Sequence, residues 1–394
     1  MKVALVSAFL EDDVYEQRLT DQFMKDVICL EDHFYHRIAK ALTNQNIDVT
    51  VFYFSDEEKM NEFSHKFGHS IIRIPAKKRK IIHESFLSAP EIIPIIKEFD
   101  ICQFVSGYYV NYKIPDMFDY IVRKLHGEIP IVARWAGGNH KWLFPIRKTI
   151  KKKALEKCDK IICSGMEEQN VLRQIFRIPN EKIISLTNPV DFELFKKRDR
   201  EKIIEKIGLE KNKKYFLYVG RLTKNKGIEE MLNVFNNLIL NYAELKLIII
   251  GDGPFLEYIK NFIKKNKLEN KILLKGRLTH ETACYYYNAS IALINIGHSA
   301  GLANVIIEAL ASELPVISTD VGASRDFINE KFKNGLLIKP GNETELKKSL
   351  IKILEESEKF QDADKSKLEQ FSYKNFGEKM NEIYQQCLNN STFR

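Results

Sequence analysis

The sequence has no paired-cysteine motif and no long apolar run, and both absences narrow the kind of protein it encodes. Its six cysteines never form a C-x-x-C pair, and several lie inside apolar runs. This argues against a disulfide framework or a zinc site and favours a reducing compartment. No stretch reaches the roughly 20 apolar residues that a membrane-spanning helix needs. The first apolar run, residues 3–6, is too short for a signal peptide, so we expect a cytoplasmic protein.

Two motifs of cofactor-dependent or metal-dependent enzymes are either absent or placed outside the predicted strand ends. The first apolar run is followed by Ser7-Ala8-Phe9-Leu10 and not by the G-x-G-x-x-G fingerprint of dinucleotide-binding oxidoreductases. One D-x-D triplet, Asp362-Ala363-Asp364, lies in a polar C-terminal segment and is interpreted as solvated surface. We therefore expect no bound metal and no cofactor.

What the sequence does contain is the composition of an ordinary two-domain protein. It has 394 residues, of which 44% are apolar and 29% charged. Lys and Arg (61) exceed Asp and Glu (53) by 8. This moderate basic excess favours anionic partners such as phosphates or a lipid surface.

Short apolar runs alternate with longer amphipathic segments along the chain. Near-continuous Val, Ile and Leu runs are typical of strands buried on both faces, as in a parallel sheet covered by helices. We predict strands over residues 2–7, 48–53, 71–74, 101–105, 129–133, 160–163, 215–219, 247–250, 272–275, 291–294 and 316–318.

The predicted fold is α/β, with two doubly wound, Rossmann-like domains facing a central cleft. A charged, proline-marked stretch around residues 188–214 separates the two halves. We place the N-terminal domain at residues 1–190 and the C-terminal domain at residues 200–365. A last helix within residues 366–390 is expected to pack back on the N-terminal domain. Ligands in such folds bind beyond the carboxyl ends of the strands.

The first chemical signal is a pair of cations just after a predicted strand. The strand ends near Gly220 and the next helix begins near Gly227, which places Arg221 and Lys226 at the strand's carboxyl end. Arg can grip a diphosphate with two parallel hydrogen bonds, and Lys can hold it as a point charge. The alternative is an ordinary solvated basic loop.

The second signal is the run Gly301-Leu302-Ala303-Asn304-Val305, which leads into a mostly apolar helix. Free backbone N–H groups and the helix dipole at such an N-terminus favour phosphate oxygens. Glu308 follows about one turn into the helix, where its carboxylate could accept hydrogen bonds from a ribose diol. The alternative is a glutamate at the edge of the core that pairs with a lysine.

Together these runs resemble the C-terminal domain of retaining glycosyltransferases of the GT-B fold, in particular family 4 (glycosyl transferases group 1). The N-terminal half matches more weakly, around residues 130–137, 158–160 and 187–191. The matching motifs of the C-terminal half stand in the family's order: G-R-L-x-x-x-K-G at 220–227, I-G-D-G-P at 250–254, K-G-R-L at 275–278, G-L-x-N-V-x-x-E-A at 301–309 and L-P-V-I-S-T-D-V-G at 314–322.

The resemblance implies a nucleotide-sugar donor, UDP- or GDP-linked, in the C-terminal domain, and an acceptor read by the N-terminal domain. It implies transfer with retention of configuration and without a metal. The implied donor-binding residues are Arg221 and Lys226 for the diphosphate, Glu308 for the ribose, Arg277 and Leu278 beside the base, and the loop with Gly301, Leu302, Asn304 and Val305 for the phosphates and sugar. Residues 251–254 would shape the pocket floor.

The sequence departs from the family where the transferred sugar is handled. The family usually carries a glutamate eight positions before Glu308 and a histidine after the fifth strand, but here these positions are Ala300 and Ala136. No catalytic residue is assigned. The candidates that stand near these positions are His298, His140 and Arg134, and the pair Trp135 and Trp142 could stack on a sugar face or could simply pack in a loop.

Two basic clusters, residues 77–80 (Lys77 to Lys80) and 147–153 (Arg147 to Lys153), lie in the N-terminal half. The second falls on a predicted amphipathic helix, which could rest on an anionic membrane on the cytoplasmic face or could be a solvated helix surface. No recognition motif accompanies the charge, so nucleic-acid binding is not expected.

The leading hypothesis is therefore a metal-independent, retaining hexosyl-type transferase that acts on a glycan or a lipid-linked saccharide. The alternative, suggested by Ala300 and Ala136, is a nucleotide-sugar-binding protein with impaired catalysis that serves another transferase as partner or regulator.

Overall fold

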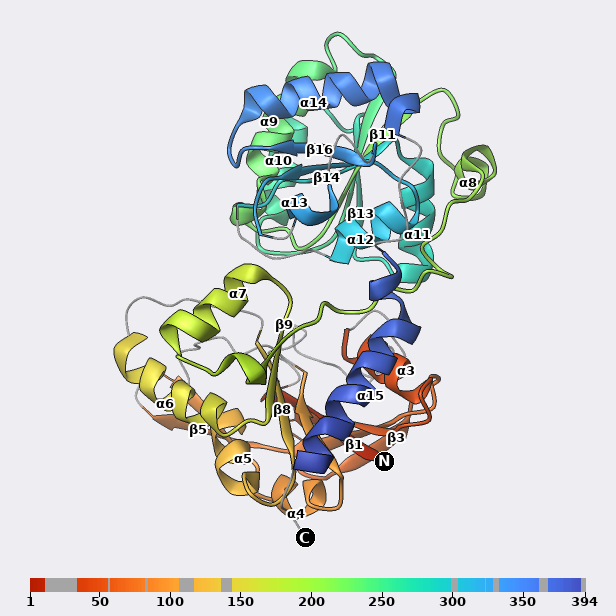
Figure 1. Cartoon of the computed structure of the whole chain (residues 1–394). Helices are drawn as coiled ribbons and strands as arrows, with labels where there is room; N and C mark the ends of the chain where they lie inside the picture. Colours follow the sequence, from red (N-terminus) through yellow and green to blue (C-terminus); the bar gives the residue numbers. More distant parts are fainter. Residues whose placement is uncertain are drawn as a thin grey trace. The chain divides into compact units, whose positions relative to one another are not determined.

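Figure 1 shows the computed structural model of the chain, which describes residues 1–10, 34–55, 57–81, 84–105, 117–135, 144–298, 304–322, 324–328, 333–360 and 368–390. The chain forms two compact units. Unit 1 combines Met1–Pro189 with Tyr373–Arg394, and unit 2 is Val190–Ser372. Each unit is built on a mainly parallel sheet with helices on both faces, which confirms the predicted α/β class with two Rossmann-like domains.

The sheet of unit 1 has eight strands in the order β10-β9-β8-β7-β1-β2-β4-β3. All neighbours are parallel except β3 and β4, and a separate antiparallel pair joins β5 to β6. The strands are β1 Lys2–Leu10, β2 Asp48–Ser55, β3 Asn61–Ser64, β4 Ser70–Pro75, β5 Lys77–Ile81, β6 Glu84–Ser88, β7 Ile101–Phe104, β8 Ile131–Trp135, β9 Lys160–Cys163 and β10 Ile183–Ser185.

Helices cover both faces of this sheet, and two separate hydrophobic clusters lie beneath them. One face carries α3 (Phe34–Thr43) and α15 (Tyr373–Asn390), and the other carries α4 (Ile92–Ile96), α5 (Met117–Leu125) and α6 (Phe144–Glu156) (Figure 1). A short helix α7 (Met166–Asn170), a π-helical turn (Val171–Ile175) and a 3-10 turn (Asn180–Lys182) complete the unit. Every residue of β7 and β8 is buried, which explains why their sequences are apolar apart from Gln103 and Arg134 and do not alternate with exposed polar residues.

Unit 2 has a six-stranded, fully parallel sheet in the order β13-β12-β11-β14-β15-β16. Helices α9, α10 and α14 pack on one face, and α11 and α12 on the other (Figure 1). The elements are α8 Arg200–Lys206, β11 Lys214–Val219, the 3-10 turn η3 Lys224–Lys226, α9 Ile228–Leu238, β12 Leu245–Ile250, α10 Leu256–Lys265, β13 Ile272–Gly276, α11 His280–Ala289, β14 Ala292–Asn295, α12 Asn304–Ala311, β15 Val316–Thr319, α13 Ser324–Phe327, β16 Gly335–Ile338, α14 Glu343–Glu356, and 3-10 turns Ser357–Phe360 and Glu369–Phe371.

The last helix belongs to unit 1 although the whole of unit 2 precedes it in sequence. Phe376, Met380 and Tyr384 of α15 are buried in the same cluster as α3. The Tyr384 hydroxyl donates a hydrogen bond to the Gln103 side chain on β7, and both groups are buried. These contacts tie the C-terminal helix to the sheet of unit 1.

One of the predicted basic clusters is not the exposed surface that we expected. Lys151 of α6 is only 3% exposed, and its ammonium lies 3.1 Å from the carboxylate of Asp119 on α5, which is 6% exposed. The ammonium also stands 5.2 Å from the centre of the Phe118 ring. The interpretation of residues 147–153 as one solvated charge patch was therefore wrong for Lys151, which serves the packing of α5 against α6 instead.

The described residues bear on two features that the sequence argued against, disulfide bonds and membrane-spanning helices. Five cysteines lie in the described ranges, and all five are buried and free of disulfide bonds. Among the helices that the structure describes, none is long and apolar enough to cross a membrane.

Candidate functional site

The strand order of the unit 2 sheet reverses between β11 and β14, and the candidate site lies at the carboxyl ends of these two strands. From β11 the chain adds β12 and β13 on one side and β14, β15 and β16 on the other. Loops that leave neighbouring strands in opposite directions open a crevice at their carboxyl ends, which is where ligands bind in such sheets. The two loops at this position contain Arg221 and Lys226 after β11, and His298 after β14.

Backbone contacts join these two loops closely. Gly227 has φ +70°, and a Cβ at this position would overlap the carbonyl oxygen of Ile296. The His298 N–H donates to the Asn225 carbonyl across 2.9 Å. Because only glycine fits at residue 227, the loop can turn tightly enough to bring Lys226 beside residues 296–298.

The electrostatics of Lys226 point to an anionic ligand. Its side chain is partly buried, and burial together with the nearby Arg221 lowers the pKa of the ammonium. Within the part of the chain that the structure describes, the Lys226 ammonium makes no ion pair or hydrogen bond. A partly desolvated cation beside a second cation is unfavourable until an anion joins them.

A second glycine contact sets the floor of this crevice. Gly251 follows β12 with φ +142°, and a Cβ there would overlap the carbonyl oxygen of Gly220. Backbone hydrogen bonds between β11 and β12 continue past the ends of the strands. The Gly220 N–H donates to the Ile250 carbonyl, and the Leu222 N–H donates to the Asp252 carbonyl. The backbone around Arg221 is thereby held against residues 251–253.

The remaining predicted donor residues lie on the same edge of the sheet where the structure describes them. Arg277 is exposed and Leu278 half-buried in the turn between β13 and α11, while Asn304 and Val305 open helix α12. Gly301 and Leu302, together with Ala300, lie outside the described residues.

Glu308 lies in α12 and is only 2% exposed. The Tyr287 hydroxyl donates to its Oε2 across 2.7 Å, and Nε2 of His280 stands 3.4 Å from its Oε1. Both partners come from α11, and the Phe195 ring packs edge-on against each of them. The alternative interpretation paired Glu308 with a lysine, whereas the partners found here are a tyrosine and a histidine, which the sequence did not single out because they are distant in the chain.

His298, a candidate for sugar contact, is anchored by a neighbouring acid. Its Nε2 lies 2.8 Å from Oε1 of Glu230 on α9, and its side chain is 39% exposed. The ring is therefore accessible and oriented at the crevice edge, next to the loop that carries Lys226.

The candidates in unit 1 occupy different environments. Arg134 is 3% exposed on β8, and its NH2 group donates to Ser164 Oγ at 3.0 Å and to the Leu186 carbonyl at 3.4 Å. Burial lowers the pKa of this guanidinium to about 10. Trp135 is fully buried against Phe176, so the interpretation of Trp135 as a sugar-stacking surface was wrong. His140, Ala136 and Trp142 lie outside the described residues.

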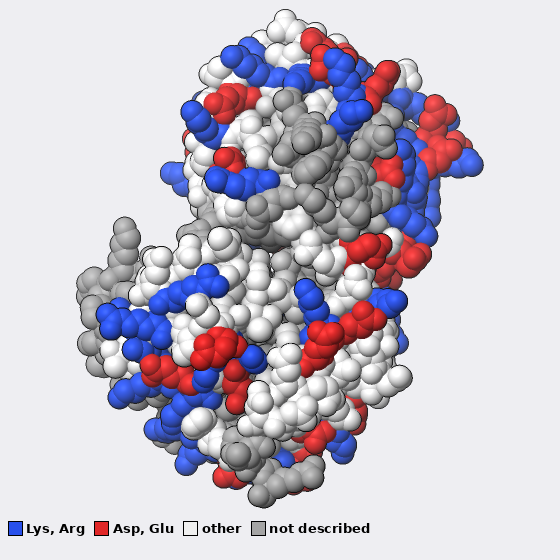
Figure 2. All heavy atoms as spheres, in the orientation of Figure 1, with Lys and Arg blue, Asp and Glu red and all other residues white. Residues whose placement is uncertain are grey.

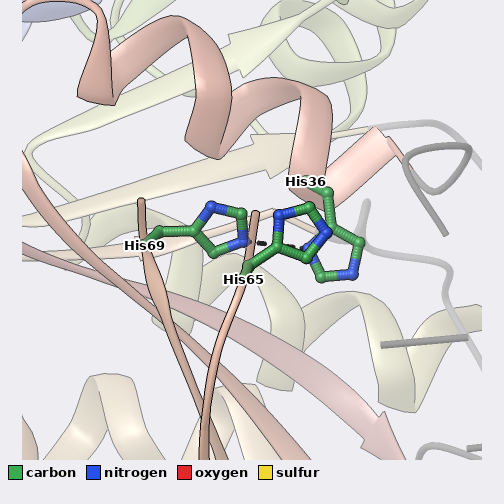
Figure 3. A group of neighbouring side chains, drawn as sticks. All are labelled: His36, His65 and His69. Atoms are coloured by element: carbon green, nitrogen blue, oxygen red, sulfur yellow. Dashed lines mark hydrogen bonds between the residues drawn. The ribbon is translucent and has the colours of Figure 1, made fainter. Parts of the chain in front are cut away.

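Unit 1 also contains a group of histidines that sequence reasoning overlooked. His36, His65 and His69 are buried and offer ring nitrogens that all lie within 4.8 Å of one another (Figure 3). The signal in the sequence was the spacing H-x-x-x-H at residues 65–69, but the third histidine is 29 positions from His65. The expectation of no metal site did not take this group into account.

A second basic surface lies at the opposite, amino-terminal edge of the unit 2 sheet. It surrounds a cavity of about 470 Å³ and includes six cations and one acid. Several of these cations already bind the protein: Lys197 pairs with Glu313 at 2.7 Å, and Arg200 donates to two backbone carbonyls. Basic charge alone therefore does not distinguish the two edges, whereas the position of Lys226 at the carboxyl ends of β11 and β14 does.

The chain belongs to the family of two-domain glycosyltransferases whose models match both of its halves. Residues 33–194 match the model described as Glycosyltransferase Family 4, and residues 199–370 match the model described as Glycosyl transferases group 1. The predicted family and the GT-B fold are thereby confirmed.

Individual relatives are distant and align over only part of their length. N-acetyl-alpha-D-glucosaminyl L-malate synthase of Bacillus anthracis is 24% identical over 64% of this chain and 65% of its own. A Campylobacter jejuni enzyme, N-acetylgalactosamine-N,N'-diacetylbacillosaminyl-diphospho-undecaprenol 4-alpha-N-acetylgalactosaminyltransferase, is 32% identical over 54% of each chain. The chain thus spans less than two thirds of the length of these relatives.

Among solved structures, Anabaena Alr3699/HepE in complex with UDP superimposes with a TM-score of 0.69. It is 15% identical to this chain and covers 98% of it, and the match covers 100% of the HepE chain. At this identity the likeness shows a shared fold.

Proposed function

We propose that the protein is a retaining glycosyltransferase that moves a sugar from a UDP- or GDP-sugar to a glycan or lipid-linked saccharide without a metal. The observation that carries this proposal is the ammonium of Lys226, which is partly buried beside Arg221 at the switch point of the unit 2 sheet and makes no ion pair with any residue that the structure describes. The family to which the chain belongs supports the reaction type.

Arg221 and Lys226, the cations of the loop after β11, would bind the donor diphosphate and supply most of its electrostatic stabilisation. Transfer breaks the bond between the anomeric carbon and the diphosphate oxygen, so negative charge develops on the leaving group. Lys226 and Arg221 would stabilise that charge more strongly in the transition state than in the ground state, which lowers the barrier. Bound cations of this kind replace the divalent ion on which other phosphate-handling enzymes depend.

The other residues on this edge would fix the donor's orientation. Glu308 would accept hydrogen bonds from the ribose hydroxyls, with Tyr287 and His280 holding its carboxylate in place. Arg277 and Leu278 would flank the base, and the loop of residues 301–305 would approach the phosphates and sugar. His298, held by Glu230, is the candidate for contact with the transferred sugar.

The acceptor is proposed to be a glycan or a lipid-linked saccharide, and the name of the Campylobacter jejuni relative includes diphospho-undecaprenol, a lipid carrier. Membrane association would then depend on the cations of α6 other than Lys151. Lys152 already pairs with Glu156 at 3.4 Å, so Lys148 and Lys153 would contribute more of the attraction to anionic lipid. On the face shown in Figure 2, Lys and Arg side chains over unit 1 alternate with Asp and Glu. This mixture favours a weak, salt-sensitive contact.

Release of nucleoside diphosphate from a panel of UDP- and GDP-sugars, with and without saccharide acceptors, tests the proposal. We expect at least one donor to be consumed and the product to keep the donor's anomeric configuration by NMR. Chelator should leave the rate unchanged. Measurable binding of nucleoside diphosphate without turnover of any donor would instead indicate the catalytically impaired binding protein.

A further inference from the structure

Three buried histidines in unit 1 converge from two elements that are separate in sequence. His36 lies in the first turn of α3, while His65 and His69 frame the tight turn between strands β3 and β4. Their exposed fractions are 0%, 5% and 2%. Figure 3 shows the three rings close together between the helix and the hairpin, with a hydrogen bond between His36 and His69, and all three ring pairs are stacked. This lies at the β3 edge of the unit 1 sheet and is distinct from the proposed donor site, which is in unit 2.

The turn holds two of the rings in fixed positions. The His65 N–H donates to the His69 carbonyl, and the Gly68 N–H donates to the His65 carbonyl, both across 2.9 Å. The resulting spacing of H-x-x-x-H falls within the range found between histidine pairs in zinc sites. On the other side, Lys40 of α3 stands over the Phe67 ring at 4.6 Å, which holds the helix against the same turn.

The distances between the ring nitrogens suit a borderline divalent cation. A tetrahedral zinc ion with Zn–N bonds of about 2.0–2.1 Å separates its nitrogen ligands by roughly 3.3–3.4 Å. Here His36 Nδ1 and His69 Nε2 share a hydrogen bond of 3.0 Å, which a bound ion would replace, and one ring nitrogen from each of the three residues lies within 4.8 Å of the other two. The first pair needs to open by a few tenths of an ångström, and the His65 ring, which is stacked on both others, needs to turn its edge toward them.

The chemistry of the group also suits a metal. His69 Nδ1 is buried and has no hydrogen-bond partner among the residues that the structure describes, which is unusual for a buried polar atom. His65 Nδ1 accepts a 3.2 Å hydrogen bond from the Phe67 N–H, so an ion would bind at the other ring nitrogen, Nε2, which releases its proton on binding. Imidazole nitrogens are the preferred ligands of zinc, copper, nickel and cobalt, whereas magnesium and calcium select oxygen.

We propose that His36, His65 and His69 form a metal site for a divalent ion of the zinc class, which joins the β3–β4 hairpin to helix α3. Three protein ligands leave the fourth position of a tetrahedral ion for a water molecule. The ion links elements that no disulfide connects, so its removal loosens the edge of the unit 1 sheet. This role is independent of the donor-binding function and of the metal-independent transfer that we propose for unit 2.

Zinc binding to the untagged, chelator-stripped full chain tests the site, measured by competition with a chromophoric chelator. We expect one ion per chain. The variants His65→Gln and His69→Gln should each bind zinc roughly 100-fold more weakly, as expected when one of three ligands is lost. The matched control His126→Gln, an exposed histidine after α5, should bind as the wild type does. Zinc should also raise the Tm of the wild type and of the control, but not that of the two site variants.

A spectroscopic measurement on the wild type keeps the proposal testable if the variants fail to fold. Cobalt(II) bound at this site should give the visible d–d absorption of a four-coordinate ion with nitrogen ligands. Absence of stoichiometric zinc binding to the wild type would overturn the proposal. Unchanged affinity in folded His65→Gln and His69→Gln variants would overturn it equally, and so would a cobalt spectrum of six oxygen ligands.

Discussion

Replacing Lys226 or Arg221 by alanine is expected to weaken the binding of nucleoside diphosphate ten- to hundred-fold, or about 1.4–3 kcal/mol. The physical reason is the electrostatic state of the loop after β11. Burial and the nearby Arg221 already lower the pKa of the Lys226 ammonium. A bound diphosphate would pair with both cations and so offset the cost of burial and the repulsion between them. Isothermal titration calorimetry with UDP and GDP at fixed ionic strength measures the loss.

The neighbouring lysine of the same turn provides a matched control. Lys224 is exposed and stands two positions from Lys226, so Lys224→Ala removes the same charge from the same loop. If the site depends on specific contacts, this control should bind within about threefold of the wild type, because an exposed charge is well screened. Equal losses in all three variants would show a general effect of charge, and no loss in either site variant would remove Lys226 and Arg221 from the donor site.

The second large effect is expected in the core of unit 1. Lys151→Met should lower the free energy of unfolding by roughly 3–5 kcal/mol, because it leaves the Asp119 carboxylate buried without its cation. The double variant Lys151→Met/Asp119→Leu should recover most of this loss, since apolar side chains of similar size can replace a buried ion pair at little cost. Urea denaturation followed by far-UV circular dichroism measures each variant.

An exposed lysine on the same helix is the control for this cycle. Lys153→Met should change the free energy of unfolding by no more than about 0.5 kcal/mol, as is usual for surface positions. If Lys151→Met lowered the free energy of unfolding as little as Lys153→Met does, the ion pair would be less buried than the 3% and 6% exposed fractions of its side chains indicate. A double variant as unstable as Lys151→Met would mean that the loss comes from packing around Phe118 and not from the charge left behind.

Most central strands of both sheets were predictable because burial on both faces leaves a direct trace in the sequence. Runs such as residues 247–250 and 292–294 are apolar without alternation, and they became central strands. Short edge strands leave a weaker trace. Strand β5 is Lys-Lys-Arg-Lys-Ile, and strand β3 shows partial burial on one side only, so neither has the composition of a buried strand.

The loop that carries the candidate donor residues Arg221 and Lys226 could be located from the sequence, because glycine and strand-end signals mark it in any parallel sheet. Their role in donor binding stays a prediction. Partners that come from another element left no local trace. Tyr287 and His280 beside Glu308, and Asp119 beside Lys151, are joined only when the chain folds. The histidine group of unit 1 has the same origin.

A crystal structure of the protein with UDP or GDP would show directly where the diphosphate binds. We expect its oxygens to contact Lys226 and Arg221 at the carboxyl edge of β11 and β14. A diphosphate seated instead in the basic cavity at the amino-terminal edge, among residues such as Lys197 and Arg200, would contradict this expectation.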